Sequence, residues 1–417
     1  MNRPASEFVE HRLPNGLRVI VEPMPHARSV AAGFLVRTGA RDETPEVAGV
    51  SHFLEHMCFK GTPNRTWRQI NIDFDNLGST YNAYTSKERT FYYGWVRDSD
   101  LEAQVEILSD MMRSVLPPDE FTMEKKVILE EIAMSEDQLD RHVYELIHEK
   151  LYAGHSLQWP VLGTQETVGA MTREQMKAYF DERYHPANMV LLIAGNVTPD
   201  EAKRVAEKVC GDWAGRSPRP ARLAPPTMKP GAASWKMDRF QQQAVAIVFP
   251  GPSAVHADRE NGDVVGAILG GHNSRFYWKI VQAGIAPHLW AGRIDYCDSG
   301  LMVLCGFSEP DRVGELHDAM RREADRLMKD GVTDDEVNRV KVRSRTGLAT
   351  EAEAPYYRLN QMVSDIDDFD RPRTVAERMA AIETVTAQSV RGYLERWPVS
   401  GPGFVCSIGP REWTAGN

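Results

Sequence analysis

The two halves of this chain of 417 residues repeat one order of elements, and the repeat restricts the possible folds more than any other feature. Residues 171–180 (MTREQMKAYF) have the pattern of a helix, and residues 189–194 have that of a short buried strand. Residues 385–394 (VTAQSVRGYL) and 403–408 repeat this order near the end of the chain, and a glycine follows each strand. A tandem duplication of one α+β domain explains the repeat most simply.

A proline-rich segment separates the two halves. Five prolines lie from Pro218 to Pro230, in a stretch with little apolar periodicity, and this composition is typical of an extended linker. We therefore predict an N-terminal domain over residues 1–217, a linker over residues 218–233 and a C-terminal domain over residues 234–417. Each domain is expected to hold a mixed or antiparallel β-sheet flanked by helices, and the length of the chain agrees with two large domains.

The charge and the cysteine content exclude several classes of protein. The 49 basic and 59 acidic residues give a net charge of -10, which disfavours nucleic acid and anionic membranes as partners. The five cysteines are scattered and include no C-x-x-C pair, so they indicate a reducing compartment rather than disulfides or a cysteine zinc site. Residues 1–16 contain no apolar run like that of a signal peptide, and no segment approaches the roughly 20 apolar residues of a membrane span. We expect a soluble, cytoplasmic protein.

The first half begins with two strands and a helix. Residues 17–22 and 29–38 have strand patterns, and a helix is predicted from about residue 47. Residues 80–85 and 90–96 are rich in β-forming residues and flank a polar turn, which predicts a hairpin. The elements alternate irregularly, without a βαβ repeat or a glycine-rich phosphate loop, so we expect no nucleotide site.

Residues 52–56 (HFLEH) place two imidazoles and one carboxylate on one face of this predicted helix. Because positions i, i+3 and i+4 share a helical face, His52 and His56 are suited to bind one metal ion while Glu55 reaches a water molecule in the same site. The spacing is the reverse of the commoner H-E-x-x-H order. The alternative interpretation is a pair of partly buried histidines, hydrogen-bonded on an amphipathic helix.

A catalytic zinc site usually has three protein ligands, so a third must come from another part of the chain. A long helix is predicted from residues 117–119, and Glu131 lies on its apolar face. The same face contains Val127, Ile128 and Ile132. A carboxylate that faces a protein core needs a partner such as a cation, so we predict Glu131 as the third ligand. Glu124, two turns earlier on this face, is predicted to orient a ligand. The alternative for Glu131 is an ordinary solvated carboxylate.

The predicted site is suited to the hydrolysis of amides. One zinc ion lowers the pKa of a bound water and polarises a carbonyl oxygen. Glu55 is expected to take a proton from the water and then to deliver a proton to the leaving amine, so that one carboxylate serves as base and then as acid. Two histidines and a glutamate also accept cobalt or manganese, so the residues alone do not select zinc.

Three longer segments carry a resemblance to a known family: residues 13–19 (LPNGLRV), 37–43 (RTGARDE) and 49–62 (GVSHFLEHMCFKGT). With these segments the chain resembles, over nearly its whole length, the pitrilysin or insulinase-type inverzincin metallopeptidases, in particular their processing-peptidase-like branch. The resemblance implies a zinc endopeptidase in which Glu55 is catalytic and His52 and His56 bind zinc. The family's third ligand is a glutamate about 75 residues beyond the second histidine, which is the separation of Glu131 from His56. A further family glutamate, seven residues earlier, falls on Glu124.

The resemblance also implies how peptides and partner chains bind. In this family the segment that matches residues 82–85 forms an exposed strand edge that pairs with an extended peptide, so Asn82 and Ala83 are the expected substrate-binding residues. The alternative for Asn82 is a turn or strand-end residue. Family members have two related α+β domains per chain, and two such chains face each other around a closed chamber that favours short or unfolded peptides.

The second half departs from the family pattern in two ways. It lacks zinc ligands, and it lacks an arginine and a tyrosine that help members acting alone to bind substrate and to stabilise the transition state. In residues 280–287 the corresponding positions hold Val281 and Pro287, whose side chains donate no hydrogen bond. Four neighbours are possible substitutes: Arg275, Tyr277, Arg293 and Tyr296. We expect this chain to be the catalytic subunit of a dimer. If the dimer is a heterodimer, a homologous chain without zinc would supply the arginine and the tyrosine.

Two other functions stay open at the level of sequence. One is a non-catalytic or assembly subunit that keeps the peptidase fold, which a degenerate motif would favour, whereas His52, Glu55 and His56 are all present. The other is a metal-dependent amidohydrolase that acts on small molecules, which a small closed pocket would favour.

Overall fold

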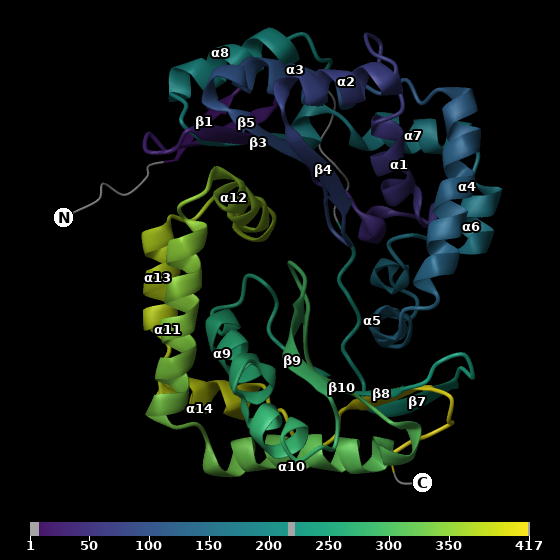
Figure 1. Cartoon of the computed structure of the whole chain (residues 1–417), viewed down its shortest axis with the longest axis vertical. Helices are drawn as coiled ribbons and strands as arrows, with labels where there is room; N and C mark the ends of the chain where they lie inside the picture. Colours follow the sequence, from purple (N-terminus) through teal and green to yellow (C-terminus); the bar gives the residue numbers. More distant parts are fainter. Residues whose placement is uncertain (1–7, 216–221, 416–417) are drawn as a thin grey trace. The chain divides into compact units, whose positions relative to one another are not determined.

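The computed structural model describes residues 8–215 and 222–415. Two sequence predictions fall partly outside the described residues. They are the domain boundary between residues 217 and 218, with the first prolines of the linker, and the first seven residues of the N-terminal segment. The described residues form two compact units, each with one β-sheet and flanking helices (Figure 1). The α+β class with two sheet-containing domains, predicted from the duplication, is confirmed.

The sheet of unit 1 has six strands in the order β1-β2-β6-β3-β5-β4. The strands are β1 (Val9–Arg12), β2 (Arg18–Pro23), β3 (Ser29–Val36), β4 (Thr80–Thr85), β5 (Thr90–Arg97) and β6 (Met189–Gly195). β2 and β6 are parallel and the other pairs are antiparallel, so the sheet is mixed. β4 and β5 form the predicted hairpin, with Thr85 paired to Thr90. This hairpin places β4 at one edge of the sheet.

Helices cover both faces of this sheet. The helices of unit 1 are α1 (Val50–Cys58), α2 (Trp67–Leu77), α3 (Leu101–Met111), α4 (Pro118–Ser135, whose last two residues belong to unit 2), α6 (Gln165–Ala170), α7 (Arg173–Arg183), α8 (Pro199–Cys210) and α12 (Pro355–Phe369). Val19 and Val21 pack on the face that carries α1 and α3, whereas Ile20 packs on the face that carries α12. Because both faces are buried, strands such as β6 (MVLLIAG) are apolar throughout rather than alternating.

The sheet of unit 2 has five strands in the order β7-β11-β8-β10-β9. The strands are β7 (Gly231–Lys236), β8 (Gln243–Pro250), β9 (His288–Asp295), β10 (Gly300–Ser308) and β11 (Phe404–Gly409). The helices that accompany them are α5 (Leu139–Leu151), α9 (Arg259–Gly270), α10 (Val313–Asp330), α11 (Asp334–Glu351), α13 (Val375–Glu383) and α14 (Ala387–Arg396). β7 and β11 are parallel, so this sheet is also mixed. β7 begins inside the predicted linker, whose last three residues are therefore part of a sheet.

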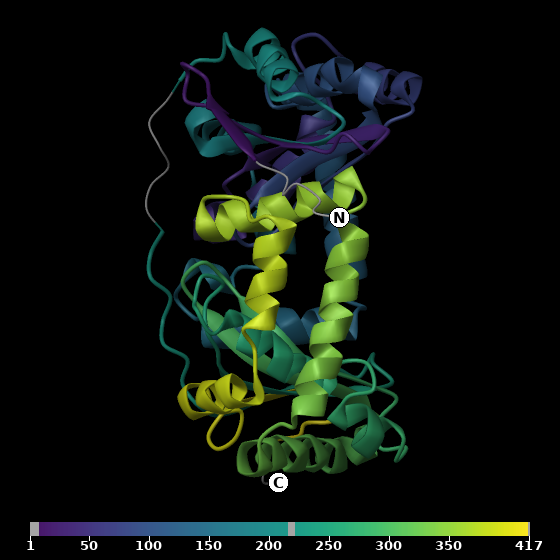
Figure 2. The same ribbon diagram turned by 90° about the vertical axis from the view of Figure 1, so that its left-hand side faces the viewer.

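Each unit contains a helix from the half of the sequence that forms the sheet of the other unit. Residues 134–158, which include α5, pack against the sheet of unit 2, and residues 349–376, which include α12, pack against that of unit 1 (Figures 1 and 2). The predicted ranges 1–217 and 234–417 describe the repeat in the sequence, whereas each packed unit contains segments from both. In the described ranges, no helix combines the length and the apolar character that crossing a membrane requires.

Candidate metal centre

The start of α1 is fixed by a buried glutamate. Gly49 caps the helix with a φ of 96°, and a Cβ there would lie 2.7 Å from the carbonyl oxygen of Leu162, so only glycine fits. The carboxylate of Glu43 accepts hydrogen bonds from the backbone N–H groups of Gly49 (2.7 Å) and Ser51 (2.8 Å). Burial raises the pKa of Glu43 to about 7, although these hydrogen bonds oppose the shift. The position of the helix, and of the histidines that follow, is thereby set.

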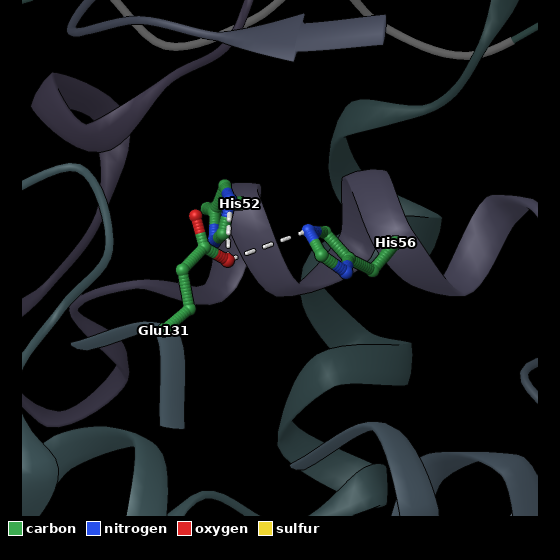
Figure 3. Close-up of side chains that lie close together, drawn as sticks. All are labelled: His52, His56 and Glu131. Carbon is green, nitrogen blue, oxygen red and sulfur yellow. Dashed lines mark ion pairs between the residues drawn. The ribbon is translucent and has the colours of Figure 1, made fainter. Parts of the chain in front are cut away.

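The three predicted metal ligands converge on one point. His52 and His56 project from adjacent turns of α1, and both turn towards a single carboxylate oxygen of Glu131 on α4 (Figure 3). The Nε2 atoms of His52 and His56 lie 3.7 and 3.8 Å from Glu131 Oε2. One possible ligand atom from each of the three residues lies within 4.8 Å of the other two.

This arrangement fits a tetrahedral metal ion. Nitrogen and oxygen ligands bound at 2.0–2.2 Å to one tetrahedral zinc lie about 3.3–3.6 Å from each other, which is close to the two distances observed here. His52 is buried and the side chain of Glu131 is 40% exposed, so the site opens to solvent on the glutamate side. Two imidazoles and a carboxylate are the ligand set of several catalytic zinc sites that keep one position open.

The face of α4 differs in one respect from the sequence prediction. Ile128 and Ile132 are buried as expected, but Val127 is 47% exposed and does not share the buried face of the helix. Glu131 lies at the border of that face instead of inside the core. Its orientation therefore does not follow from the apolar pattern of α4, and the two histidines of α1 are the groups that it faces.

Glu124 lies where a group that orients His56 is needed. Its Oε1 is 2.8 Å from Nδ1 of His56, and its Oε2 is 2.6 Å from Nζ of Lys60. Since a carboxylate only accepts hydrogen bonds, Nδ1 carries the proton and Nε2 keeps its lone pair on the side of Glu131. Burial alone would raise the pKa of Glu124, but the hydrogen bonds from His56 and Lys60 outweigh burial and lower it. Burial alone would lower the pKa of His56, but the hydrogen bond to Glu124 and the charges of three nearby carboxylates outweigh burial and raise it.

Glu55 lies beside the ligands and is itself held in place. Its Oε2 accepts a hydrogen bond of 2.7 Å from the hydroxyl of Thr85, the last residue of β4. Burial raises the pKa of Glu55, and the hydrogen bond from Thr85 and the charge of His56 only partly oppose this. A carboxylate with a raised pKa beside a metal site is suited to accept and return a proton.

The predicted substrate-binding residues lie on the free edge of the sheet. Asn82 and Ala83 are in β4, which pairs with β5 on one side and, in the described part of the chain, with no strand on the other. Asn82 is exposed and Ala83 is buried, so their side chains point to opposite faces of the sheet. Figure 1 shows β4 next to α1, and the two elements are in contact. Thr85, at the end of this strand, contacts Glu55, so the strand lies next to the candidate metal site.

Sequence reasoning overlooked three residues of this site. Lys60 follows His56 by four residues, so the helical spacing that identified the histidines could have identified it. Thr85 shares the face of Ala83 by strand alternation, but only the packing of β4 against α1 brings it to Glu55. Glu43 ends the family-like segment 37–43, but its role could not be predicted from the sequence, because that role depends on the fold of the turn before α1.

The four residues considered as substitutes for the missing arginine and tyrosine have structural partners in unit 2. They are Arg275, Tyr277, Arg293 and Tyr296. Arg275 forms hydrogen bonds of 2.7 and 2.9 Å with Glu336, and Arg293 forms one of 2.9 Å with Asp263. Tyr296 is buried with its hydroxyl against Nε2 of His148, and the hydroxyl of Tyr277 accepts a hydrogen bond from Gln282. All four side chains therefore have hydrogen-bond partners within unit 2.

Comparisons with known proteins agree with the fold and indicate a protein family. A family model described as insulinase (peptidase family M16) matches residues 18–165, and one described as the peptidase M16 inactive domain matches residues 170–343. The chain is 31% identical to the uncharacterized zinc protease YmxG of Bacillus subtilis, covering 91% of this chain and 92% of that protein. It is 30% identical to an uncharacterized zinc protease of Rickettsia felis, with the same coverage.

Solved structures share the fold at low sequence identity. A protease from Helicobacter pylori superposes with a TM-score of 0.91 at 18% identity, over 97% of this chain and 99% of that one. A putative M16-like peptidase from Alicyclobacillus acidocaldarius gives 0.85 at 23% identity, over 98% and 99% of the two chains. A Pseudomonas fluorescens protein described as a peptidase M16 inactive domain gives 0.87 at 15% identity, over 99% of each chain.

Proposed function

Because the chain belongs to the insulinase family of M16 peptidases, we propose that it is a zinc-dependent endopeptidase that hydrolyses peptide bonds in short or unfolded peptides. The observation that carries this proposal is the convergence of His52, His56 and Glu131, with Glu55 beside them. Relatives over nine tenths of the chain are named zinc proteases, which agrees with the same chemistry.

Each residue of the site has its own role in the proposed reaction. Zinc bound by the two histidines and Glu131 would supply a Lewis acid for a water molecule and for the scissile carbonyl. Glu55 accepts a proton from the attacking water and delivers a proton to the nitrogen of the leaving amine, which breaks the C–N bond. Glu124 holds the proton of His56 on Nδ1, so that Nε2 stays available as a ligand.

The free edge of β4 is the proposed binding site for the peptide backbone. Main-chain hydrogen bonds to alternate residues along this edge, in the segment that contains Asn82 and Ala83, would hold an extended peptide without demanding one particular side chain. A site built in this way accepts peptides that are already unfolded, because a folded substrate has no free strand to offer.

We propose that the active form is a dimer with an enclosed chamber, in which a homologous chain without zinc supplies an arginine and a tyrosine. Support comes from Val281 and Pro287, which the resemblance of residues 280–287 to the family pattern places at these two positions. Further support comes from the partners that hold the neighbouring arginines and tyrosines within unit 2. Without such a donor, the negative charge that develops on the carbonyl oxygen lacks one of its usual stabilising groups.

A non-catalytic subunit that keeps the peptidase fold is the second candidate. One observation favours it. Val281 and Pro287 donate no side-chain hydrogen bond, and this absence is expected in a chain that has lost catalytic activity as well as in one that needs a partner. The complete set of His52, Glu55, His56 and Glu131 favours the catalytic subunit instead.

The test combines metal analysis with a quenched-peptide assay, with and without homologous chains from the same cell. We expect one zinc per chain, weak cleavage by the chain alone and strong cleavage with a partner. Glu55→Gln should keep the zinc and abolish the cleavage, whereas Glu130→Gln, an exposed control on α4, should change neither. A zinc-loaded chain that cleaves no peptide with any partner would support the non-catalytic subunit.

A further inference from the structure

The hydroxyl proton of Thr85 has one strong acceptor. Thr85 Oγ1 lies 2.7 Å from Glu55 Oε2 and 3.5 Å from Thr90 Oγ1, which is at the limit of a hydrogen bond. The hydroxyl of Thr90 donates its own proton to the carbonyl oxygen of Thr38 at 3.0 Å. Thr85 therefore donates to Glu55, and this hydrogen bond occupies one of the two oxygens of the carboxylate.

The position of Thr85 is set by the sheet and not by a flexible loop. Thr85 pairs with Thr90 at the end of the β4–β5 hairpin, and its side chain lies on the same face as Ala83. A hydroxyl fixed on a strand restricts the rotation of a glutamate that otherwise has three free torsions. Hydrogen bonds to an ionised carboxylate are stronger than those between neutral groups, and the distance of 2.7 Å lies within the usual range for such bonds.

We infer that Thr85 is a positioning residue, whose hydroxyl holds Oε2 of Glu55 so that Oε1 is the oxygen that exchanges protons with the water and with the leaving amine. The inference rests on the proposed peptidase function, because it assigns a task to one oxygen of the proposed base. During turnover the proton taken from water resides on Oε1, and Oε2 keeps accepting from Thr85 in both protonation states of Glu55.

This role connects the base to the proposed peptide-binding edge. Thr85 lies two residues beyond Ala83 on β4, so one strand both presents backbone groups to a peptide and holds the catalytic carboxylate. The reach of the base and the register of the bound peptide are then fixed together. Misplacement of a reacting group by about 1 Å can cost roughly 100-fold in rate, so a strand that sets both positions contributes to turnover more than to binding.

The experiment compares Thr85→Val, which removes the hydroxyl at constant shape, with Thr85→Ser, which keeps it. Thr227→Val is the control, because Thr227 is an exposed threonine that lies outside both sheets. In the active assembly we expect Thr85→Val to lower kcat by about 10- to 100-fold with KM and zinc content unchanged. Thr85→Ser should stay within about 3-fold of the native chain, and Thr227→Val should match it.

A structural readout separates this inference from the peptidase assignment. Crystal structures of the zinc-loaded chain should show Glu55 in one rotamer in the native protein and in Thr85→Ser, and in several rotamers in Thr85→Val. An ordered Glu55 with native kcat in Thr85→Val overturns the inference, as does an equal loss of kcat in Thr227→Val. If the native assembly cleaves no peptide, the proposed function fails, and the rotamers of Glu55 still decide whether Thr85 positions it.

Discussion

The hydrogen-bonded chain from His56 through Glu124 to Lys60 allows one prediction to be worked out in detail. Glu124→Gln keeps the size of the side chain but replaces one carboxylate oxygen with an NH2 group. If the amide oxygen faces His56, the NH2 group meets the ammonium of Lys60, and two donors oppose each other. If the amide turns over, the NH2 group meets Nδ1 of His56, which must then become an acceptor.

The second orientation affects the metal directly. A neutral imidazole carries one proton, so an unprotonated Nδ1 forces the proton onto Nε2, the nitrogen that faces Glu131. A protonated Nε2 cannot bind a metal ion. Either orientation of the amide therefore weakens the site, through a lost ion pair or through the wrong tautomer of His56. Loss of groups that orient a ligand costs about 10- to 100-fold in metal affinity, which corresponds to about 1.4–2.7 kcal/mol.

Zinc affinity measured by competition with a chelator at pH 7 is the assay. Glu124→Gln should bind zinc about 10- to 100-fold more weakly than the native chain, and the exposed control Glu130→Gln should bind it equally well. Adding Lys60→Met to Glu124→Gln removes the opposing donor, so the double variant should recover part of the affinity. A Glu124→Gln chain with native zinc affinity would refute the role assigned to this hydrogen-bonded chain.

Three further predictions concern the site and the stability of unit 1. Glu131→Gln should lose zinc, whereas Glu55→Gln should retain it and lose about 100- to 10,000-fold in turnover; metal analysis and the peptide assay read out both. The ion pair between Arg358 (1% exposed) and Glu22 (3% exposed) is buried, so Arg358→Met should lower the free energy of unfolding by about 3–5 kcal/mol in urea titrations at pH 7. Because burial raises the pKa of Glu43 from 4.5 to about 7, the folded state holds this proton more tightly than the unfolded state. The stabilisation is complete below pH 4.5 and is lost as the pH rises through 7, so the native chain should lose stability relative to Glu43→Gln over that window, and equal pH profiles in thermal unfolding would contradict this.

Local patterns were sufficient to predict the elements that form the site. The strands around the motif begin within one residue of their predicted starts, because buried strands and the β4–β5 turn have strong local signals. His52, Glu55 and His56 could be placed on one face, because helical spacing fixes their relative directions whatever surrounds them. Their neighbours could not be placed in this way. The exposure of Val127 and the bond from Thr85 to Glu55 depend on how α4 and β4 pack against α1.

The exchange of α5 and α12 between the halves has no signal in the sequence. An amphipathic helix shows which of its faces is buried, but it does not show which sheet will cover that face. Leu359, Met362 and Ile366 form an ordinary apolar stripe, and nothing in that stripe points to the sheet of unit 1. The partner of a helix is decided by long-range packing, which is the part of a fold that local propensity predicts least.

The placement of α12 also sets the order in which the protein can be completed during synthesis. Glu22 and Arg358 pair across 336 positions of sequence, so one face of the first sheet stays uncovered until α12, in the last quarter of the chain, has been made. β6 ends at Gly195 and α12 ends at Phe369, an interval that a ribosome needs about 9–35 s to translate at roughly 5–20 residues per second. For that time the nascent chain exposes an apolar sheet face, and it is then most exposed to aggregation and most dependent on chaperones.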